Sequence, residues 1–202
     1  MNPVNPAIQE RKADLRRQVQ AGLKHLSSDA RATGSRQACA RLKGQRAWVD
    51  AGTVLLYSPL PDELDVESIL HEALRAGKNL TLPGFDPAKQ AYLARRVLDL
   101  QADLRPGRFG ISEPNARCPE VPLNQLDFVV APGVAFSLDG RRLGRGKGYY
   151  DRLLASVGGV KCGIAFEEQI VDAIPAEPHD VCMDFLLTPA RWLRVDRGAV
   201  LK

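Results

Sequence analysis

The chain has 202 residues, of which 45% are hydrophobic and 26% charged, a composition typical of a folded, water-soluble protein with a substantial core. Its net charge of +4 permits an anionic ligand, but no nucleic-acid-binding module, membrane-spanning run or signal peptide is recognisable. The four cysteines lack zinc-finger spacing. We expect one cytoplasmic domain over residues 1–202, a monomer without nucleic-acid or membrane partners.

Three helices are predicted in the first part of the chain. Apolar residues recur at helical spacing over residues 8–26, which predicts an amphipathic helix. Ser27-Ser28-Asp29 is a cap sequence, and a second helix is expected from there to about Trp48. Asp65 is expected to cap a third helix that ends at Gly77.

Short apolar runs predict strands, and a further helix is expected over residues 149–157. The strands are expected at residues 53–57, 80–83, 91–100, 127–131, 160–166, 185–188 and 192–195. Residues 105–122 are rich in proline and glycine and are interpreted as a long loop. Strands that alternate with helices predict an α/β fold with a mostly parallel sheet and helices on both faces.

Residues 143–152, Leu-Gly-Arg-Gly-Lys-Gly-Tyr-Tyr-Asp-Arg, carry the strongest functional signal. Glycines let the backbone approach a ligand closely, and the cations Arg145 and Lys147 suit phosphates. A helix is expected to begin here and to direct its N-terminus at the same place. Asp151 suits a divalent metal that accompanies phosphates. The spacing matches neither a Walker loop nor a dinucleotide fingerprint, and a basic surface turn is the alternative.

Three other groups are candidates for the site. Asp62-Glu63-Leu64-Asp65 follows a predicted strand, where ligands bind in parallel sheets, or it forms a solvated turn with a helix cap. Asp184 abuts a predicted buried strand and is either paired, metal-bound or exposed. Lys12 and Arg16 share one helix face, which contacts a ligand or only water. His179 is a candidate to line the site.

Residues 127–152, Asp-Phe-Val-Val-Ala-Pro-Gly-Val-Ala-Phe-Ser-Leu-Asp-Gly-Arg-Arg followed by the motif above, resemble the hallmark of 5-formyltetrahydrofolate cyclo-ligases, also called methenyltetrahydrofolate synthetases. The likeness extends to residues 163–170, 62–63 and 12–16, and it follows the family's order along nearly the whole chain. It implies an α/β sandwich similar to ribose-5-phosphate isomerase and CoA transferases, in agreement with the predicted elements.

The resemblance implies ATP-dependent closure of 5-formyltetrahydrofolate into 5,10-methenyltetrahydrofolate, with ATP as co-substrate and Mg²⁺ as cofactor. The formyl oxygen is expected to attack the γ-phosphoryl group, giving an imidate-like phosphate that leaves when N-10 closes the ring. Two alternatives remain open: a family paralogue with a different substrate, and a non-catalytic nucleotide- or RNA-binding protein that uses the same basic loop.

The resemblance also assigns roles to single residues. Arg145 and Lys147 are the implied catalytic cations, Glu63 and Tyr150 contact the folate, and Asp151 and Asp184 bind magnesium. The implied ATP contacts are Lys12, Arg16, Arg142, Leu143, Gly144, Arg145, Gly146, Lys147, Gly148, Tyr149 and Tyr150. Residues 109–114 resemble a loop of bacterial members, with no contact assigned.

Overall fold

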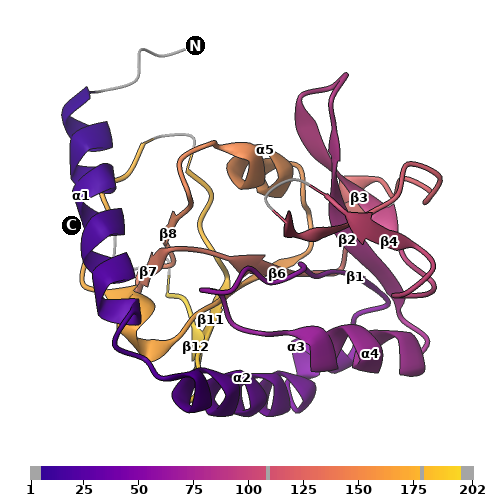
Figure 1. Ribbon diagram of the computed structural model, residues 1–202, viewed down its shortest axis with the longest axis horizontal. Helices are drawn as coiled ribbons and strands as arrows, with labels where there is room; N and C mark the ends of the chain where they lie inside the picture. The colour runs from indigo at the N-terminus through magenta and orange to yellow at the C-terminus, as the bar shows by residue number, and fades with distance from the viewer. Residues whose placement is uncertain (1–5, 108–109, 178–179, 197–202) are drawn as a thin grey trace.

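A seven-stranded, mostly parallel sheet organises the protein, as predicted (Figure 1). The computed structural model describes residues 6–107, 110–177 and 180–196. The strand order is β12-β11-β9-β6-β1-β2-β3, and only the edge strands β12 and β3 pair antiparallel. The strands are β1 (Thr53–Leu55), β2 (Asn79–Asp86), β3 (Ala91–Arg96), β6 (Phe128–Pro132), β9 (Val160–Ile164), β11 (Phe185–Leu187) and β12 (Trp192–Arg194).

Helices cover both faces of this sheet, which confirms the predicted arrangement. Figure 1 shows α2, α3 and α4 beneath the sheet, α5 above it, and α1 at its left edge. Their bounds are α1 (Pro6–Leu23), α2 (Ser28–Lys43), α3 (Arg46–Val49), α4 (Glu67–Arg75) and α5 (Tyr149–Ala155), with 3-10 turns η2 (Leu123–Gln125) and η3 (Glu167–Gln169). The single helix predicted to reach Trp48 is wrong, because the chain leaves the helix at Gly44 and starts again as α3.

The core has two layers because successive strand side chains point to opposite faces. Val54 and Val130 pack in the layer that contains α2 and α4 residues. Leu55 and Val129, their immediate neighbours, pack in the layer that contains Leu153 of α5. Burial on both faces explains why the strands read as continuous apolar runs.

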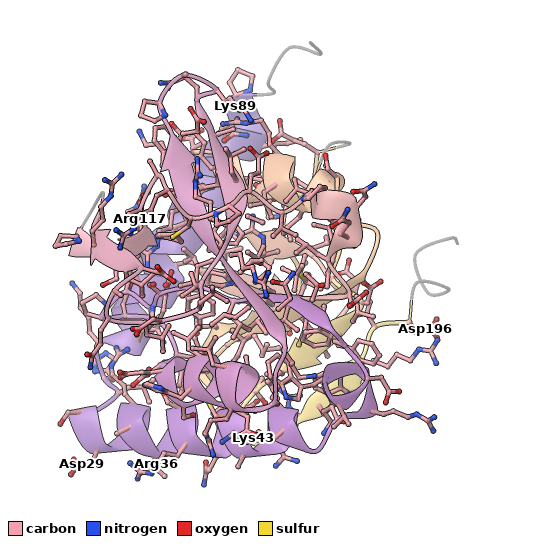
Figure 2. All side chains as sticks on the ribbon, turned by 90° about the vertical axis from the view of Figure 1, so that its right-hand side faces the viewer. Asp29, Arg36, Lys43, Lys89, Arg117 and Asp196 are labelled. Carbon is pink, nitrogen blue, oxygen red and sulfur yellow. The ribbon has the colours of Figure 1, made fainter. Side chains whose placement is uncertain are left out.

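The outer face of α2 carries charge and faces away from the core. Figure 2 shows Asp29, Arg36 and Lys43 along the bottom of the molecule. The buried side of the helix is narrow and holds small residues such as Ala38 and Cys39. The cap predicted at its start is confirmed, since the Ser27 hydroxyl accepts a hydrogen bond from Ala30 N–H.

Short strands also occur where none was predicted. The expected loop at 105–122 contains an antiparallel ribbon, and a three-stranded sheet is inserted around the β6–α5 connection. These strands are β4 (Leu104–Pro106), β5 (Ser112–Pro114), β7 (Ala135–Ser137), β8 (Arg142–Leu143) and β10 (Ile170–Val171). The long-loop prediction is therefore wrong in part, because strands of two or three residues carry no readable periodicity.

Gly163 in β9 provides a test of core packing. A Cβ built on Gly163 would overlap the ring of Phe136. We expect Gly163→Ala to lower the free energy of unfolding by about 1–3 kcal/mol, because overpacking forces side chains out of their rotamers. Urea unfolding measures the change. Gly158→Ala is the matched control, since no atom lies within 4 Å of a Cβ there; equal stability of the two variants would contradict the packing.

Candidate active site

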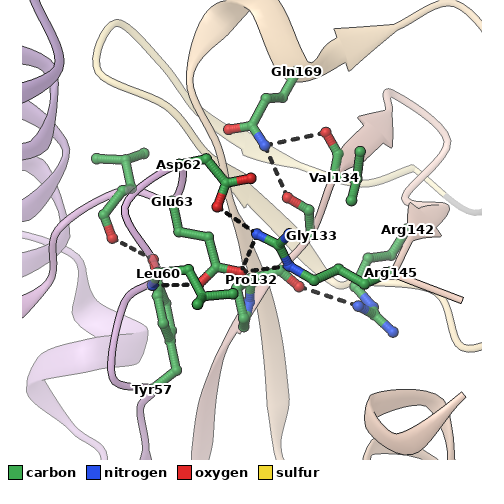
Figure 3. A network of polar contacts seen from close by, with 11 residues as sticks. Tyr57, Leu60, Asp62, Glu63, Pro132, Gly133, Val134, Arg142, Arg145 and Gln169 are labelled. Carbon is green, nitrogen blue, oxygen red and sulfur yellow. Dashed lines mark hydrogen bonds and ion pairs between the residues drawn. The ribbon is translucent and has the colours of Figure 1, made fainter. Parts of the chain in front are cut away.

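The site lies where the carboxyl ends of β1 and β6 meet. Parallel pairing of Leu55 with Val129 brings the segments that follow both strands to one edge of the sheet. After β6, Gln169 holds the backbone by donating to the carbonyl oxygens of Gly133 and Val134, at 2.8 and 3.1 Å (Figure 3). This fixes the path of the chain toward the glycine- and arginine-rich loop.

That loop, residues 143–148, has the backbone conformation that its glycines predict. Gly146 and Gly148 have φ values of +96° and +66°, in the left-handed region that strains other residues. Gly148 is the N-cap of α5, so the helix begins at Tyr149 as predicted. Lys147 is exposed, and among the described residues no carboxylate lies within ion-pair distance of it. The loop therefore presents the positive charge of Lys147, which no described carboxylate neutralises, beside a glycine-rich backbone that a ligand can approach.

Arg145 joins this loop to the segment after β1. Its Nη2 lies 2.6 Å from Asp62 Oδ1 and 3.3 Å from Glu63 Oε1 (Figure 3). The Arg145 side chain is 41% exposed, whereas that of Glu63 is only 10% exposed. Asp62 and Glu63 therefore contact the cationic loop, whereas Asp65 Oδ1 accepts from Glu67 N–H at the start of α4, as the alternative of a turn with a helix cap predicted.

Glu63 is held in place by its own turn. Its Oε2 accepts a hydrogen bond of 3.0 Å from Leu60 N–H, and Tyr57 Oη closes the segment by donating to Leu64 O at 2.7 Å (Figure 3). Burial raises the pKa of the Glu63 carboxyl, although the Leu60 N–H and Arg145 oppose this rise. A rigid, partly desolvated carboxylate of this kind is a strong hydrogen-bond acceptor.

Arg142 is a buried cation beneath the loop, with a side chain only 3% exposed. Its Nη1 donates to Pro132 O at 3.1 Å, and its Nη2 lies 2.8 Å from Asp151 Oδ1. The guanidinium carbon is 5.5 Å from the centroid of the Tyr150 ring. Arg142 thus orients Asp151 and Tyr150 and connects them to the end of β6.

The predicted N-terminal contacts lie on the other side of the loop. Arg16 Nε donates to Gly144 O at 2.8 Å, so α1 packs directly against the loop. Burial lowers the pKa of Arg16, and Asp151 and Asp180 oppose this. Lys12 is buried and lies 3.1 Å from Glu177 and 2.7 Å from Asp180. Arg16 is therefore adjacent to the site, whereas the charge of Lys12 is neutralised by the carboxylates of Glu177 and Asp180.

A cavity of about 420 Å³ lies between the segment that follows β1 and the glycine- and arginine-rich loop. Its polar groups include Glu63, Arg142, Arg145, Lys147 and Asp151, and apolar and aromatic side chains form the rest of its wall. The residues of that wall that sequence reasoning missed include Tyr57, Tyr92 and Ile111. Tyr57 ends the strand predicted at 53–57, after which ligands are expected. Tyr92 and Ile111 reach the cavity only through the register of β3 and the β4–β5 ribbon, so no local signal could have found these two.

The two predicted metal ligands are not brought together. Asp151 lines the cavity at the carboxyl edge of the sheet. Asp184 lies at the opposite edge, before β11, where its Oδ2 accepts from Lys161 N–H at 2.8 Å. Lys161 is three residues before Ile164, the partner of Pro132, a separation of roughly 10 Å along β9. The described residues contain no group of three potential metal-ligating side chains.

His179, a candidate to line the site, and Phe109, the first residue of the segment that resembles a loop of bacterial members, lie outside the described residues. The described cysteines are all free. In the described ranges, no helix is both long enough and apolar enough to span a bilayer.

Comparison with known proteins now decides the family. The model of the 5-formyltetrahydrofolate cyclo-ligase family matches residues 8–189. The chain belongs to this family. It is therefore an enzyme of the ligase class, and the non-catalytic alternative is excluded.

Individual relatives cover most of the sequence. The 5-formyltetrahydrofolate cyclo-ligase of Escherichia coli K12 is 33% identical over 159 residues, which are 77% of this chain and 87% of that one. The enzyme of Mycolicibacterium smegmatis is 34% identical over 72% of this chain and 77% of its own. The structure of 5,10-methenyltetrahydrofolate synthetase from Aquifex aeolicus matches with a TM-score of 0.83 and 36% identity, covering 95% and 96% of the two chains.

The raised pKa of Glu63 predicts a pH dependence of stability. Above the ordinary carboxyl pKa of 4.5, the folded state retains a proton that the unfolded state has lost. Glu63 therefore lowers stability as the pH rises from that value through its raised folded pKa. We expect the difference in unfolding free energy, Glu63→Gln minus wild type, to increase between about pH 4 and 7.

Chemical denaturation of the ligand-free protein at several pH values measures this difference. Glu67→Gln, on the exposed start of α4, is the control for losing one glutamate. A Glu63→Gln difference that stays constant with pH would show that Glu63 is not desolvated.

Proposed function

We propose that this enzyme uses ATP to close 5-formyltetrahydrofolate into 5,10-methenyltetrahydrofolate, with ADP and phosphate as products. The single observation that carries the proposal is the contact of Arg145 with Asp62 and Glu63, 2.6 and 3.3 Å away. This contact joins the glycine- and arginine-rich loop, which suits phosphates, to the partly desolvated carboxylate of Glu63, and both line one cavity. The similarity to named cyclo-ligases supplies the substrate.

The formyl oxygen of the substrate is a poor leaving group, so the reaction requires that it first be activated. The formyl oxygen attacks the γ-phosphorus, and the bond from phosphorus to the ADP oxygen breaks. The resulting imidate-like carbon carries a phosphate, which is a good leaving group. N-10 then attacks this carbon and loses its proton, and the C–O bond breaks as phosphate departs. Positioning and charge stabilisation are the main demands on the protein.

The residues of the cavity suit these demands. The aromatic and aliphatic wall excludes water and accepts a flat ring system. Glu63 accepts a hydrogen bond from the folate, and Tyr150 packs against it. Arg145 and Lys147 stabilise charge on the transferred phosphoryl group. The backbone of residues 142–149, with Arg16 and Lys12 behind it, holds the nucleotide.

Asp151 fits a role as the magnesium ligand of the site. Mg²⁺ commonly keeps several waters and binds one or two carboxylates together with substrate phosphates, so one carboxylate at the cavity suffices. When bound there, Mg²⁺ draws phosphate oxygens into line and neutralises their charge. Arg142 holds Asp151 Oδ1 at 2.8 Å and leaves its second oxygen for the ion. We propose Asp151 without Asp184.

The deciding experiment follows the near-ultraviolet absorbance of methenyltetrahydrofolate in the purified protein. We expect an increase that requires both ATP and 5-formyltetrahydrofolate. ATP hydrolysis stimulated by another compound, with no absorbance change, would favour a paralogue with a different substrate.

Lys147→Ala should reduce turnover strongly without unfolding the protein. Loss of one contact that stabilises transition-state charge is worth about 3 kcal/mol, or roughly a hundredfold in rate. Steady-state kinetics at saturating ATP measures the effect. Lys43→Ala, at a half-buried lysine at the end of α2 that pairs with Glu72, is the control for losing a lysine away from the site (Figure 2). Wild-type turnover of Lys147→Ala would remove Lys147 from the phosphate site.

Asp151→Asn and Asp184→Asn should have different effects. For Asp151→Asn we expect a large fall in rate, recovered in part by excess Mg²⁺, because the ion loses its carboxylate. For Asp184→Asn we expect lower thermal stability with an unchanged Mg²⁺ dependence, because Asp184 accepts from Lys161 N–H at the start of β9. Rates titrated against Mg²⁺, with melting curves, separate the two. A shifted Mg²⁺ dependence in Asp184→Asn would restore it as a ligand.

A further inference from the structure

The Arg145 guanidinium connects the two walls of the active-site cavity (Figure 3). Arg145 belongs to the glycine- and arginine-rich loop, whereas Asp62 and Glu63 belong to the segment that follows β1. Its Nη2 donates to Asp62 Oδ1 at 2.6 Å, and its Nη2 and Nε lie 3.3 and 3.4 Å from Glu63 Oε1. One guanidinium group is therefore shared by two carboxylates of the opposite wall.

This contact occupies groups that both substrates require. Under the proposed function, Glu63 accepts a hydrogen bond from the folate, and Arg145 stabilises the transferred phosphoryl group of ATP. The Oε2 atom of Glu63 is already held by Leu60 N–H at 3.0 Å, so Oε1, the atom beside Arg145, remains for the folate. The folate therefore competes with Arg145 for Oε1, and the ATP phosphates compete with the two carboxylates for the guanidinium.

Arg145 is the side of this contact that can move. Gly144 and Gly146 flank it, and Gly146 has a φ of +96°, a conformation that glycine adopts without strain. The side chains of Arg145 and Asp62 are 41% and 40% exposed, so water can replace either partner and the ion pair is weak enough to exchange. Glu63 is instead buried and held by its own turn. The contact therefore opens when Arg145 leaves.

We infer that the contact of Arg145 with Asp62 and Glu63 is a latch that couples the binding of the two substrates. The inference rests on the proposed function for the roles of Arg145 and Glu63. Either substrate must open the latch, and the substrate that binds first bears this cost. The second substrate finds Arg145 and Glu63 already separated and binds more tightly. By linkage, each substrate raises the affinity of the other by the same factor.

Asp62 is the positioning residue of this latch. It makes the shortest contact with Arg145, and the proposed function gives it no contact with either substrate. Loss of its charge therefore weakens the latch without removing a group that binds folate or ATP. A change at Asp62 thus separates the latch from the binding site itself.

Calorimetry measures the coupling with 5-formyltetrahydrofolate and AMP-PNP, an ATP analogue whose γ-phosphoryl group is not transferred. For the wild type we expect AMP-PNP to bind about fivefold more tightly when the folate is present, the lower end of the usual range for coupled sites, because the ion pair is half exposed. Asp62→Asn should bind each ligand more tightly when that ligand is alone. Its coupling should fall to about twofold, because a neutral amide holds a guanidinium less strongly than a carboxylate does.

Asp50→Asn is the matched control. It also removes the carboxylate of an ion pair with an arginine, Arg46 at 3.1 Å, but at the amino end of β1, away from the cavity. It should keep the wild-type coupling. Equal affinities for AMP-PNP with and without the folate in the wild type would overturn the latch. Weaker binding of AMP-PNP alone to Asp62→Asn would also overturn it, and would show that Asp62 presents Arg145 to the phosphates.

A measurement without substrates separates the latch from the proposed function. Urea unfolding of Asp62→Asn, Arg145→Gln and the double variant tests the contact directly, and the double variant should lose less stability than the sum of the two single losses. Additive losses reject the latch even if cyclisation is found. Non-additive losses together with coupled ligand binding support the latch even if cyclisation is not found. Failure of the wild type to bind either ligand would reject both.

Discussion

The parallel pairing of β1 with β6 is the constraint on which the site depends. Because the two strands run in the same direction, the segments that follow them leave the sheet at one edge. Arg145 comes from the second segment, and the carboxylates of Asp62 and Glu63 come from the first. An antiparallel arrangement would place these charges at opposite edges, and the cavity would lose one wall.

Arg142 makes this edge rigid. A buried guanidinium is costly unless its donors are paired. Here Nη1 donates to a backbone carbonyl of β6 and Nη2 to the Asp151 carboxylate, while the buried Nε has no hydrogen-bond partner among the described residues. The same side chain supports the Tyr150 ring. One buried cation thus fixes a carboxylate and an aromatic wall relative to the sheet, which is the preorganisation that phosphoryl transfer demands.

The ligand-free site balances most of its charges internally. Arg145 is paired with Asp62 and Glu63, and Asp151 is paired with Arg142. The Lys12 ammonium is paired with the carboxylates of Glu177 and Asp180. Ligands with phosphate and carboxylate groups must therefore exchange these partners, whereas Lys147 is available from the start. The raised pKa of Glu63 shows the cost, because a carboxylate is kept partly desolvated in the free protein.

Local chemistry alone indicated the loop at 143–148: Gly146 and Gly148 permit the positive φ values found there, and the cations between the glycines suit phosphates. The strands were also readable, because burial on both faces requires continuous apolar runs. Tertiary structure decided everything that depends on which strand end a residue occupies. It set Asp184 at the edge away from Asp151, and it brought Tyr92 and Ile111 to the cavity. Such placements follow from strand order and register, which short-range sequence patterns do not encode.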